Sequence, residues 1–173
     1  FRRVLFRSLS AAVPPLEEYL GDMRAMIDLS MDQGPHGMEV LPGRCAYTFR
    51  GNWKLQMDNG FDTYHLDAAH ASYIELMERR RKAKGDLGRQ FDFYERAADE
   101  GGIFQFRYGH CAFWRTQLVP QVKPIYPVMD EIRARVGETR ADWMLKPRNS
   151  GVFPNFQIAD TAVPMVRTFR PIT

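Results

Sequence analysis

Two histidines and two aspartates fall within residues 59–70, a stretch that holds half of the four histidines in the chain. Neutral imidazoles together with carboxylates are ligands for borderline divalent metals. The stretch therefore predicts a metal site, with His65 and His70 as ligands and Asp62 or Asp67 nearby. The same residues on a surface helix without a metal are the alternative.

The spacing of the two histidines requires a break in regular helical structure if both bind one ion. At about 100° per residue, Asp62 and His65 share a helix face, whereas His65 and His70 lie about 140° apart on an ideal α-helix. Both histidines reach one ion only if the helix is interrupted or widened into a π-type turn, which is frequent at functional sites. The zinc-protease pattern, with histidines four apart and Glu beside the first, does not match.

The motif Asp62-x-x-His65-x-x-x-x-His70, preceded by Gly-Asn-Trp-Lys at 51–54 and by Asn59, resembles a known iron-binding motif. It is similar to that of the catalytic domain in the large (α) subunit of Rieske ring-hydroxylating dioxygenases, in the benzoate, halobenzoate and anthranilate branch. The resemblance runs through most of the chain, from residues 14–20 to 153–155 and 169–172.

The order of expected elements, strands then helices then strands without regular βαβ alternation, predicts an α+β fold with an antiparallel sheet. The resemblance makes it an incomplete helix-grip (Bet v1/START-like) catalytic domain with flanking helices. Residues 1–8, with three arginines, are expected to be a junction or non-native, and 9–173 to be the partial catalytic domain. The Rieske domain is expected before residue 1 and the C-terminal part after residue 173.

The resemblance implies mononuclear Fe(II) held by His65 and His70, with Asp62 as the catalytic carboxylate that orients His65 and bridges electrons from a neighbouring subunit. It implies insertion of both atoms of O2 into a benzoate-like aromatic carboxylate to give a cis-dihydrodiol. The electrons would come from NADH through a separate reductase or ferredoxin and a [2Fe-2S] Rieske cluster in the missing N-terminal domain. A small (β) subunit and an oligomer of α and β subunits are the implied assembly.

Asn59 and Phe61 are candidate substrate-binding residues at the pocket wall, although Phe61 as plain core and Asn59 as a helix-end amide are equal alternatives. Lys54, Arg167 and Arg170 are candidate partners for a substrate carboxylate. The family's third iron ligand, a C-terminal aspartate, is expected beyond residue 173; Asp67 and Asp160 are candidate substitutes, although neither matches its position. We therefore expect the chain alone to bind iron weakly and to be inactive.

Two other functions remain open. A Rieske-type monooxygenase or O-demethylase uses the same scaffold, and a helix-grip domain without a full ligand set can act as a non-catalytic carrier of hydrophobic ligands.

Composition narrows the class of protein. With 45% hydrophobic residues and 173 residues in all, the chain suits one globular domain. Its net charge of +3 is mild, and the basic run at 79–84 is interpreted as a solvated helix end rather than a nucleic-acid site. Cys45 and Cys111 form no CxxC or CxH pair, which favours a reducing cytosol over a disulfide scaffold or a cluster in this segment. No apolar run reaches membrane-spanning length, so a cytoplasmic protein is expected.

Turn and periodicity signals predict the elements around the motif. Helices are expected from 14 to 20, from 22 to 30, from 52 to the motif, after His70, and from 128 to 136 with Gly137 as the stop, with a further turn at 142–145. Strands are expected at 38–41 and 44–50 as a hairpin, at 103–108 and 111–119 across a solvent-exposed His110, and at 156–159 and 163–169. Residues 85–102 are expected to form a polar loop.

Overall fold

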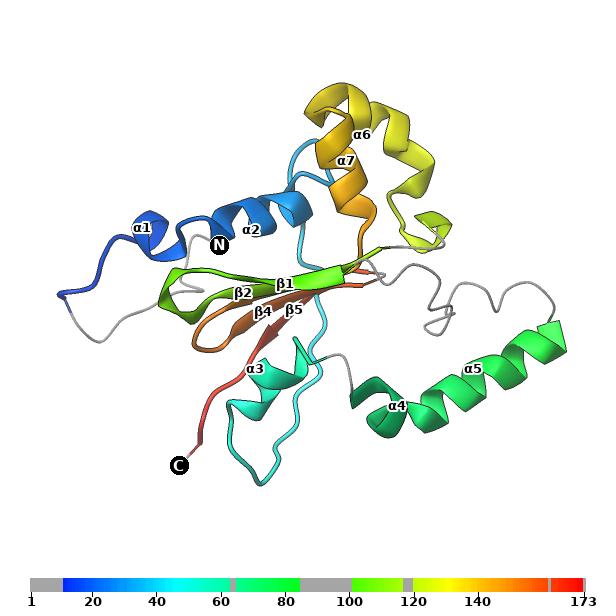
Figure 1. The fold of residues 1–173 in the computed structure, drawn as a ribbon, viewed down its shortest axis with the longest axis horizontal. Helices are drawn as coiled ribbons and strands as arrows, with labels where there is room; N and C mark the ends of the chain where they lie inside the picture. Colours follow the sequence, from blue (N-terminus) through cyan, green and yellow to red (C-terminus); the bar gives the residue numbers. More distant parts are fainter. Residues whose placement is uncertain (1–10, 63–64, 85–100, 117–119, 162, 173) are drawn as a thin grey trace.

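A five-stranded antiparallel sheet divides the protein into two sides (Figure 1). The computed structural model describes residues 11–62, 65–84, 101–116, 120–161 and 163–172. The strands follow one another in sequence order as neighbours: β1 Gly101–Gln105, β2 Cys111–Arg115, β3 Arg148–Val152, β4 Phe156–Asp160 and β5 Met165–Thr168. This confirms the predicted α+β class with an antiparallel sheet.

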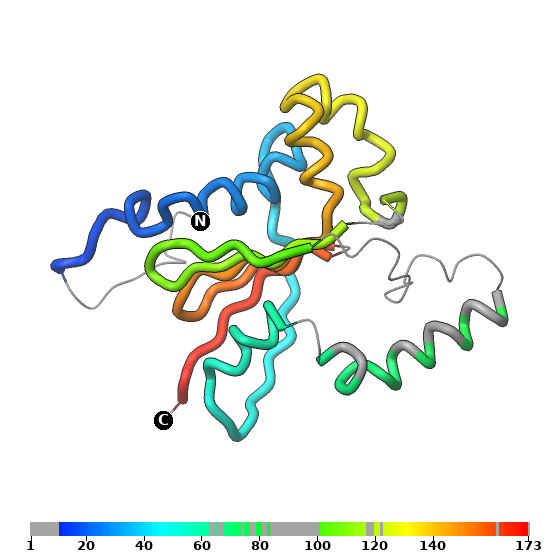
Figure 2. Tube along the Cα trace, in the orientation of Figure 1, coloured from blue at the N-terminus to red at the C-terminus, as the bar shows by residue number. Residues whose placement is uncertain are grey.

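The helices take different sides of the sheet (Figures 1 and 2). One side carries α1 Leu16–Leu20, α2 Met23–Met31, α6 Met129–Val136 and α7 Glu138–Leu145, and the other carries α3 Leu55–Asn59. Two further helices, α4 His65–Ala69 and α5 Ala71–Lys84, extend away from the sheet. Short 3-10 turns occupy Arg107–Gly109, Pro120–Val122 and Tyr126–Val128. None of the described helices is long and apolar enough to cross a membrane.

The hydrophobic core lies on the α2 side of the sheet. Val152 of β3 and Phe156 and Ile158 of β4 pack against Met23 of α2, all nearly inaccessible to solvent. A second cluster joins α2 to the α6–α7 pair through Leu29, Met129, Ile132, Ala141 and Met144. Because side chains alternate along a strand, the residues between these core positions face α3 instead.

On the α3 face, two glycines allow the α3 segment to lie very close to the sheet. A β-carbon on Gly151 of β3 would lie 2.5 Å from Phe61 Cζ and 3.0 Å from Met57 Cε, so only glycine lets these side chains reach the sheet. A β-carbon on Gly60 would lie 1.6 Å from Gln157 Nε2 of β4. The two glycines therefore allow the segment that precedes the histidine motif to lie directly on β3 and β4.

The predicted hairpin at 38–41 and 44–50 is wrong. All residues from 38 to 50 are exposed and form no strand, and this segment passes from the α2 side of the sheet to the α3 side (Figure 2). Two strands alone are marginal without a face to bury. The apolar side chains Val40 and Leu41 are each 77% exposed, so the hairpin lacks the packing that would stabilise it.

Other boundaries differ in smaller ways. β1 begins at Gly101, inside the predicted loop at 85–102, and residues 85–100 of that loop lie outside the described ones. β3 was not predicted, because Arg-Asn-Ser-Gly-Val lacks the alternating apolar pattern of a strand. The predicted helix after His70 is confirmed as α5, but Tyr73 and Leu76 are 41% and 38% exposed, so these two side chains are not buried against the sheet.

His110 is buried, not solvent-exposed as the sequence predicts. Its side chain is 1% exposed; Nε2 donates to the Tyr19 carbonyl at 2.9 Å, and Nδ1 accepts the Phe153 backbone N–H at 3.1 Å. Tyr19 Oη in turn donates to the Phe153 carbonyl at 2.7 Å. The turn sequence predicts exposure, but α1, which is far away in sequence, covers His110 and buries it. The imidazole in turn connects α1 to the sheet through its two hydrogen bonds.

This arrangement predicts a stability that depends on pH. Burial lowers the pKa of His110, opposed by the hydrogen bond to Tyr19, so the folded state prefers the neutral ring. As the pH falls, the unfolded chain binds a proton at this histidine before the folded chain does. The contribution of His110 to the free energy of unfolding is therefore full above about pH 6.5, and it is lost as the pH drops below that value toward the lower folded-state pKa.

We expect the urea midpoint of the chain to fall between pH 7.5 and pH 5. A His110→Leu variant, which cannot titrate at this position, should show a smaller fall over the same range. An equal fall in the variant would contradict the assignment to His110.

Candidate metal centre

The histidine motif lies where helical structure breaks twice. α3 ends at Asn59, α4 begins at His65 and ends at Ala69, and His70 is a bend between α4 and α5. The interruption that the spacing requires is therefore present. Asn52 Oδ1 accepts the Lys54 N–H at 3.0 Å just before α3, so the helix starts slightly later than the expected position 52.

The two imidazoles lie close together. Their ring centroids are 5.2 Å apart, with an interplanar angle of 58°. Two imidazoles that bind one ion through metal–nitrogen bonds of about 2.1 Å place their centroids about 4.6–5.3 Å apart when the angle at the ion is about 90–110°. The observed separation fits two neighbouring ligands of one metal ion.

Asp62 lies beside the first of these rings. Its Oδ2 is 3.5 Å from His65 Nδ1, and its Oδ1 accepts the His65 backbone N–H at 3.4 Å. The side-chain contact is long for a hydrogen bond, which agrees with the absence of a formed hydrogen bond at Nδ1 among the described residues. Contacts of this kind commonly tighten in the loaded site. With Nδ1 facing the carboxylate, Nε2 is the nitrogen left to bind a metal.

A third ligand is not found among the described residues, where no three His, Cys, Asp or Glu side chains are grouped to hold a metal. Asp160, one candidate substitute, is occupied elsewhere. The side chain of Asp67, the other, lies outside what the structure describes.

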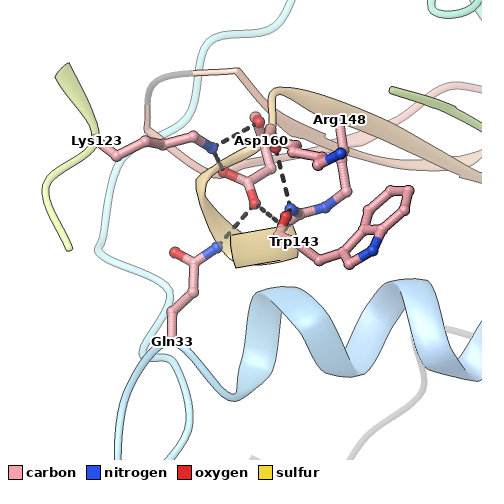
Figure 3. Close-up of polar contacts among 6 residues, drawn as sticks. Gln33, Lys123, Trp143, Arg148 and Asp160 are labelled. Atoms are coloured by element: carbon pink, nitrogen blue, oxygen red, sulfur yellow. Dashed lines mark hydrogen bonds and ion pairs between the residues drawn. The ribbon is translucent and has the colours of Figure 1, made fainter. Parts of the chain in front are cut away.

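Asp160 is the centre of a buried ion network (Figure 3). Lys123 Nζ lies 2.5 Å from its Oδ1, Gln33 Nε2 donates to its Oδ2 at 2.8 Å, and the Arg148 guanidinium also donates to Oδ2. Asp160, Lys123 and Arg148 are each about 1% exposed. Burial lowers the pKa of Lys123 and of Arg148, while the Asp160 carboxylate acts in the opposite direction on both. Both carboxylate oxygens serve this network, which accounts for Asp160 without a metal.

The two candidate pocket residues differ. Phe61 is 9% exposed and packs on Gly151, as a core side chain does. Asn59 is exposed and, with Asp62, lines a large open groove between the 38–59 segment and β5. Lys54, Arg167 and Arg170 line the same groove, so all three candidate partners for a carboxylate lie along it.

Sequence reasoning did not single out Asn149 and Gln157. Asn149 Nδ2 donates to the Gly60 carbonyl at 2.7 Å, and the Gln157 amide contacts Gly60. Nothing in the strand sequences marks either residue, because a polar residue on one face of a strand is ordinarily a solvent-facing one.

Residues 28–172 match the family described as ring hydroxylating alpha subunit (catalytic domain). This match covers most of the chain, and the chain belongs to that family. The resemblance expected from the motif is thereby confirmed.

Among curated relatives, the toluate 1,2-dioxygenase subunit alpha of Pseudomonas putida is 37% identical, over 100% of this chain and 38% of its own length. The 2-halobenzoate 1,2-dioxygenase large subunit of Burkholderia cepacia is 36% identical, over 100% of this chain and 37% of its own length. The anthranilate 1,2-dioxygenase large subunit of Acinetobacter baylyi is 37% identical, over 99% of this chain and 39% of its own length. The chain thus spans less than half the length of these relatives.

A solved structure of naphthalene 1,2-dioxygenase with indole bound superposes with a TM-score of 0.61 at 20% identity. The match covers 92% of this chain and 40% of that one. At this identity the likeness establishes the fold of the chain.

Proposed function

We propose that this chain is the catalytic iron domain of the α subunit of an aromatic ring-hydroxylating dioxygenase that acts on benzoate-like aromatic carboxylates. The observation that carries the proposal is the paired imidazoles of His65 and His70, 5.2 Å apart, with Asp62 beside the first. The aromatic-acid names of the three relatives support the substrate class. A small β subunit, a reductase or ferredoxin, NADH and a Rieske cluster complete the proposed system.

Each residue of the motif has a distinct task in this proposal. His65 and His70 would hold Fe(II), which would supply O2 activation for inserting both oxygen atoms into the ring. Asp62 would fix the orientation of His65 through Nδ1 and would link it to the Rieske cluster of a neighbouring subunit. Asn59 contacts substrate from the groove wall, and buried Phe61 shapes the floor on which α3 rests.

Asp62→Asn is expected to retain iron and the fold while turnover falls about 10 to 100-fold or more, since a carboxylate that orients a ligand imidazole has effects of this size. In the α subunit that contains this chain, product formation under steady electron supply measures turnover, and iron content measures retention of the metal. Asp58→Asn, an exposed position one helical turn away, is the matched control. Normal turnover in Asp62→Asn would refute the role.

Arg167 is the basic residue best placed to bind the substrate carboxylate. It pairs in register with Gln157, so it lies on the α3 face of β5, and it lines the same groove as Asp62. A guanidinium binds a carboxylate through two parallel hydrogen bonds, a geometry that a lysine lacks. Arg167→Gln should therefore raise KM for benzoate more than Arg44→Gln, which changes another basic residue of the groove.

Comparing benzoate, anthranilate and naphthalene in the reconstituted system tests the substrate class. The proposal expects turnover of the two acids and poor turnover of naphthalene. Incorporation of both atoms of labelled O2 into one product distinguishes dioxygenation from monooxygenation or demethylation. A clear preference for naphthalene would end the proposal for aromatic acids, and absence of iron would favour a carrier of hydrophobic ligands.

A further inference from the structure

Two amide side chains lie directly beneath the turn that leads to Asp62. Asn149 of β3 and Gln157 of β4 face α3, since they pair in register with Ala159 and Gly151. Asn149 Nδ2 donates to the Gly60 carbonyl at 2.7 Å. Gln157 is 1% exposed, and its Nε2 lies where a β-carbon of Gly60 would be, within 1.6 Å. Both amides therefore meet the backbone two residues before Asp62.

Most polar atoms of these two amides form no hydrogen bond with the described residues. Among the described residues, Asn149 Oδ1 and both Gln157 amide atoms are buried without a hydrogen-bond partner. A buried polar group without a partner destabilises a protein, whereas an apolar side chain of the same shape is close to neutral or stabilising. Stability of the folded chain thus does not explain why an amide stands at position 157.

The position of this turn determines the position of Asp62 beside the candidate metal centre. The backbone N–H groups of Phe61 and Asp62 donate to the Asp58 carbonyl at 3.0 and 2.9 Å, so Gly60 and Asp62 belong to one hydrogen-bonded turn. Asp62 reaches His65 across only 3.5 Å. A displacement of Gly60 by about 1 Å is large relative to that contact, and misplacements of this size carry large functional costs.

We propose that Asn149 and Gln157 are positioning residues that hold the Gly60 turn against the sheet and thereby fix Asp62 relative to His65. The proposal rests on the proposed function in one respect, namely that Asp62 and His65 serve a metal. Asn149 acts through its hydrogen bond to the Gly60 carbonyl, and Gln157 acts through the amide end of its side chain, which lies against Gly60.

Two variants of similar side-chain shape test this, Asn149→Leu and Gln157→Met. Co(II) is titrated into the 173-residue chain and followed by its visible absorption, and the thermal midpoint of the metal-free chain is measured by circular dichroism. We expect the Kd for Co(II) to rise about 10-fold or more in both variants. In Gln157→Met the thermal midpoint should not fall, because the substitution removes only amide atoms that lack partners.

Ser150→Ala is the matched control, because Ser150 is buried on the same strand as Asn149 and faces the opposite side of the sheet. It should leave the Kd unchanged. A lower thermal midpoint with an unchanged Kd in both amide variants would show a purely structural role and overturn the proposal.

Failure of the proposed function itself gives a different result, because the unaltered chain would then bind Co(II) no more tightly than its His65→Ala variant. Hydrogen exchange at the Phe61 and Asp62 amides of the metal-free chain decides the inference in that case. Faster exchange in both amide variants, and not in Ser150→Ala, supports the positioning role. Exchange equal to that of the unaltered chain overturns it.

Discussion

His65→Ala and His70→Ala are each expected to abolish iron binding at the mononuclear site of the α subunit that contains this chain. Loss of one of two imidazoles removes a direct ligand. The effect should exceed the 10 to 100-fold typical of losing a carboxylate that supports a ligand. Iron content after purification, measured against the absorption of the proposed Rieske cluster as an internal reference, gives the result.

His36→Ala is the control for this pair, since His36 is exposed in the turn after α2. It should retain the iron content of the unaltered protein, and all three variants should keep the cluster. Full iron stoichiometry in both His65→Ala and His70→Ala would remove the basis for the metal centre.

Asp160→Ala is expected to destabilise the chain by about 3–5 kcal/mol, the usual cost of removing one partner from a buried ion pair. The reason is the geometry around the carboxylate: Lys123 and Arg148 would be left as two buried cations without their counterion, and the Gln33 amide would lose its acceptor (Figure 3). Since a domain is stable by only about 5–15 kcal/mol, much of the protein should be unfolded at modest urea concentrations. Urea titration followed by circular dichroism measures the change.

An exposed ion pair provides the contrast. Asp130 and Arg133 of α6 are joined at 3.2 Å, with the Asp130 side chain fully open to solvent, and Asp130→Asn should leave the urea midpoint close to that of the unaltered chain. Pairs of this kind contribute little. Equal effects of Asp130→Asn and Asp160→Ala would contradict the role given to burial.

The local geometry of the histidine motif was predictable because its residues are close in sequence. The five-residue step from His65 to His70 required a break in the helix, and the bend at His70 supplies it. The strands β4 and β5 and the helices α2 and α6 were predictable for a similar reason, since proline, glycine and periodic apolar residues act locally.

Features that depend on distant partners were not predictable. His110 sits in a turn, but its environment is made by Tyr19, 91 positions earlier in the chain. Asp160 meets a lysine 37 positions away and a glutamine 127 positions away. Segment 38–50 has the alternation of a strand, yet it forms none, because strand formation needs a neighbour with free backbone groups and a face to bury.

X-ray absorption at the iron edge of the purified α subunit reports directly on the mononuclear iron ligands, because scattering from imidazole rings counts the histidines. We expect two imidazoles per mononuclear iron, once the contribution of the proposed Rieske cluster is subtracted with the spectrum of the His65→Ala variant. A difference spectrum with no imidazole contribution, or with sulfur neighbours, would contradict the assignment of His65 and His70 as the ligands.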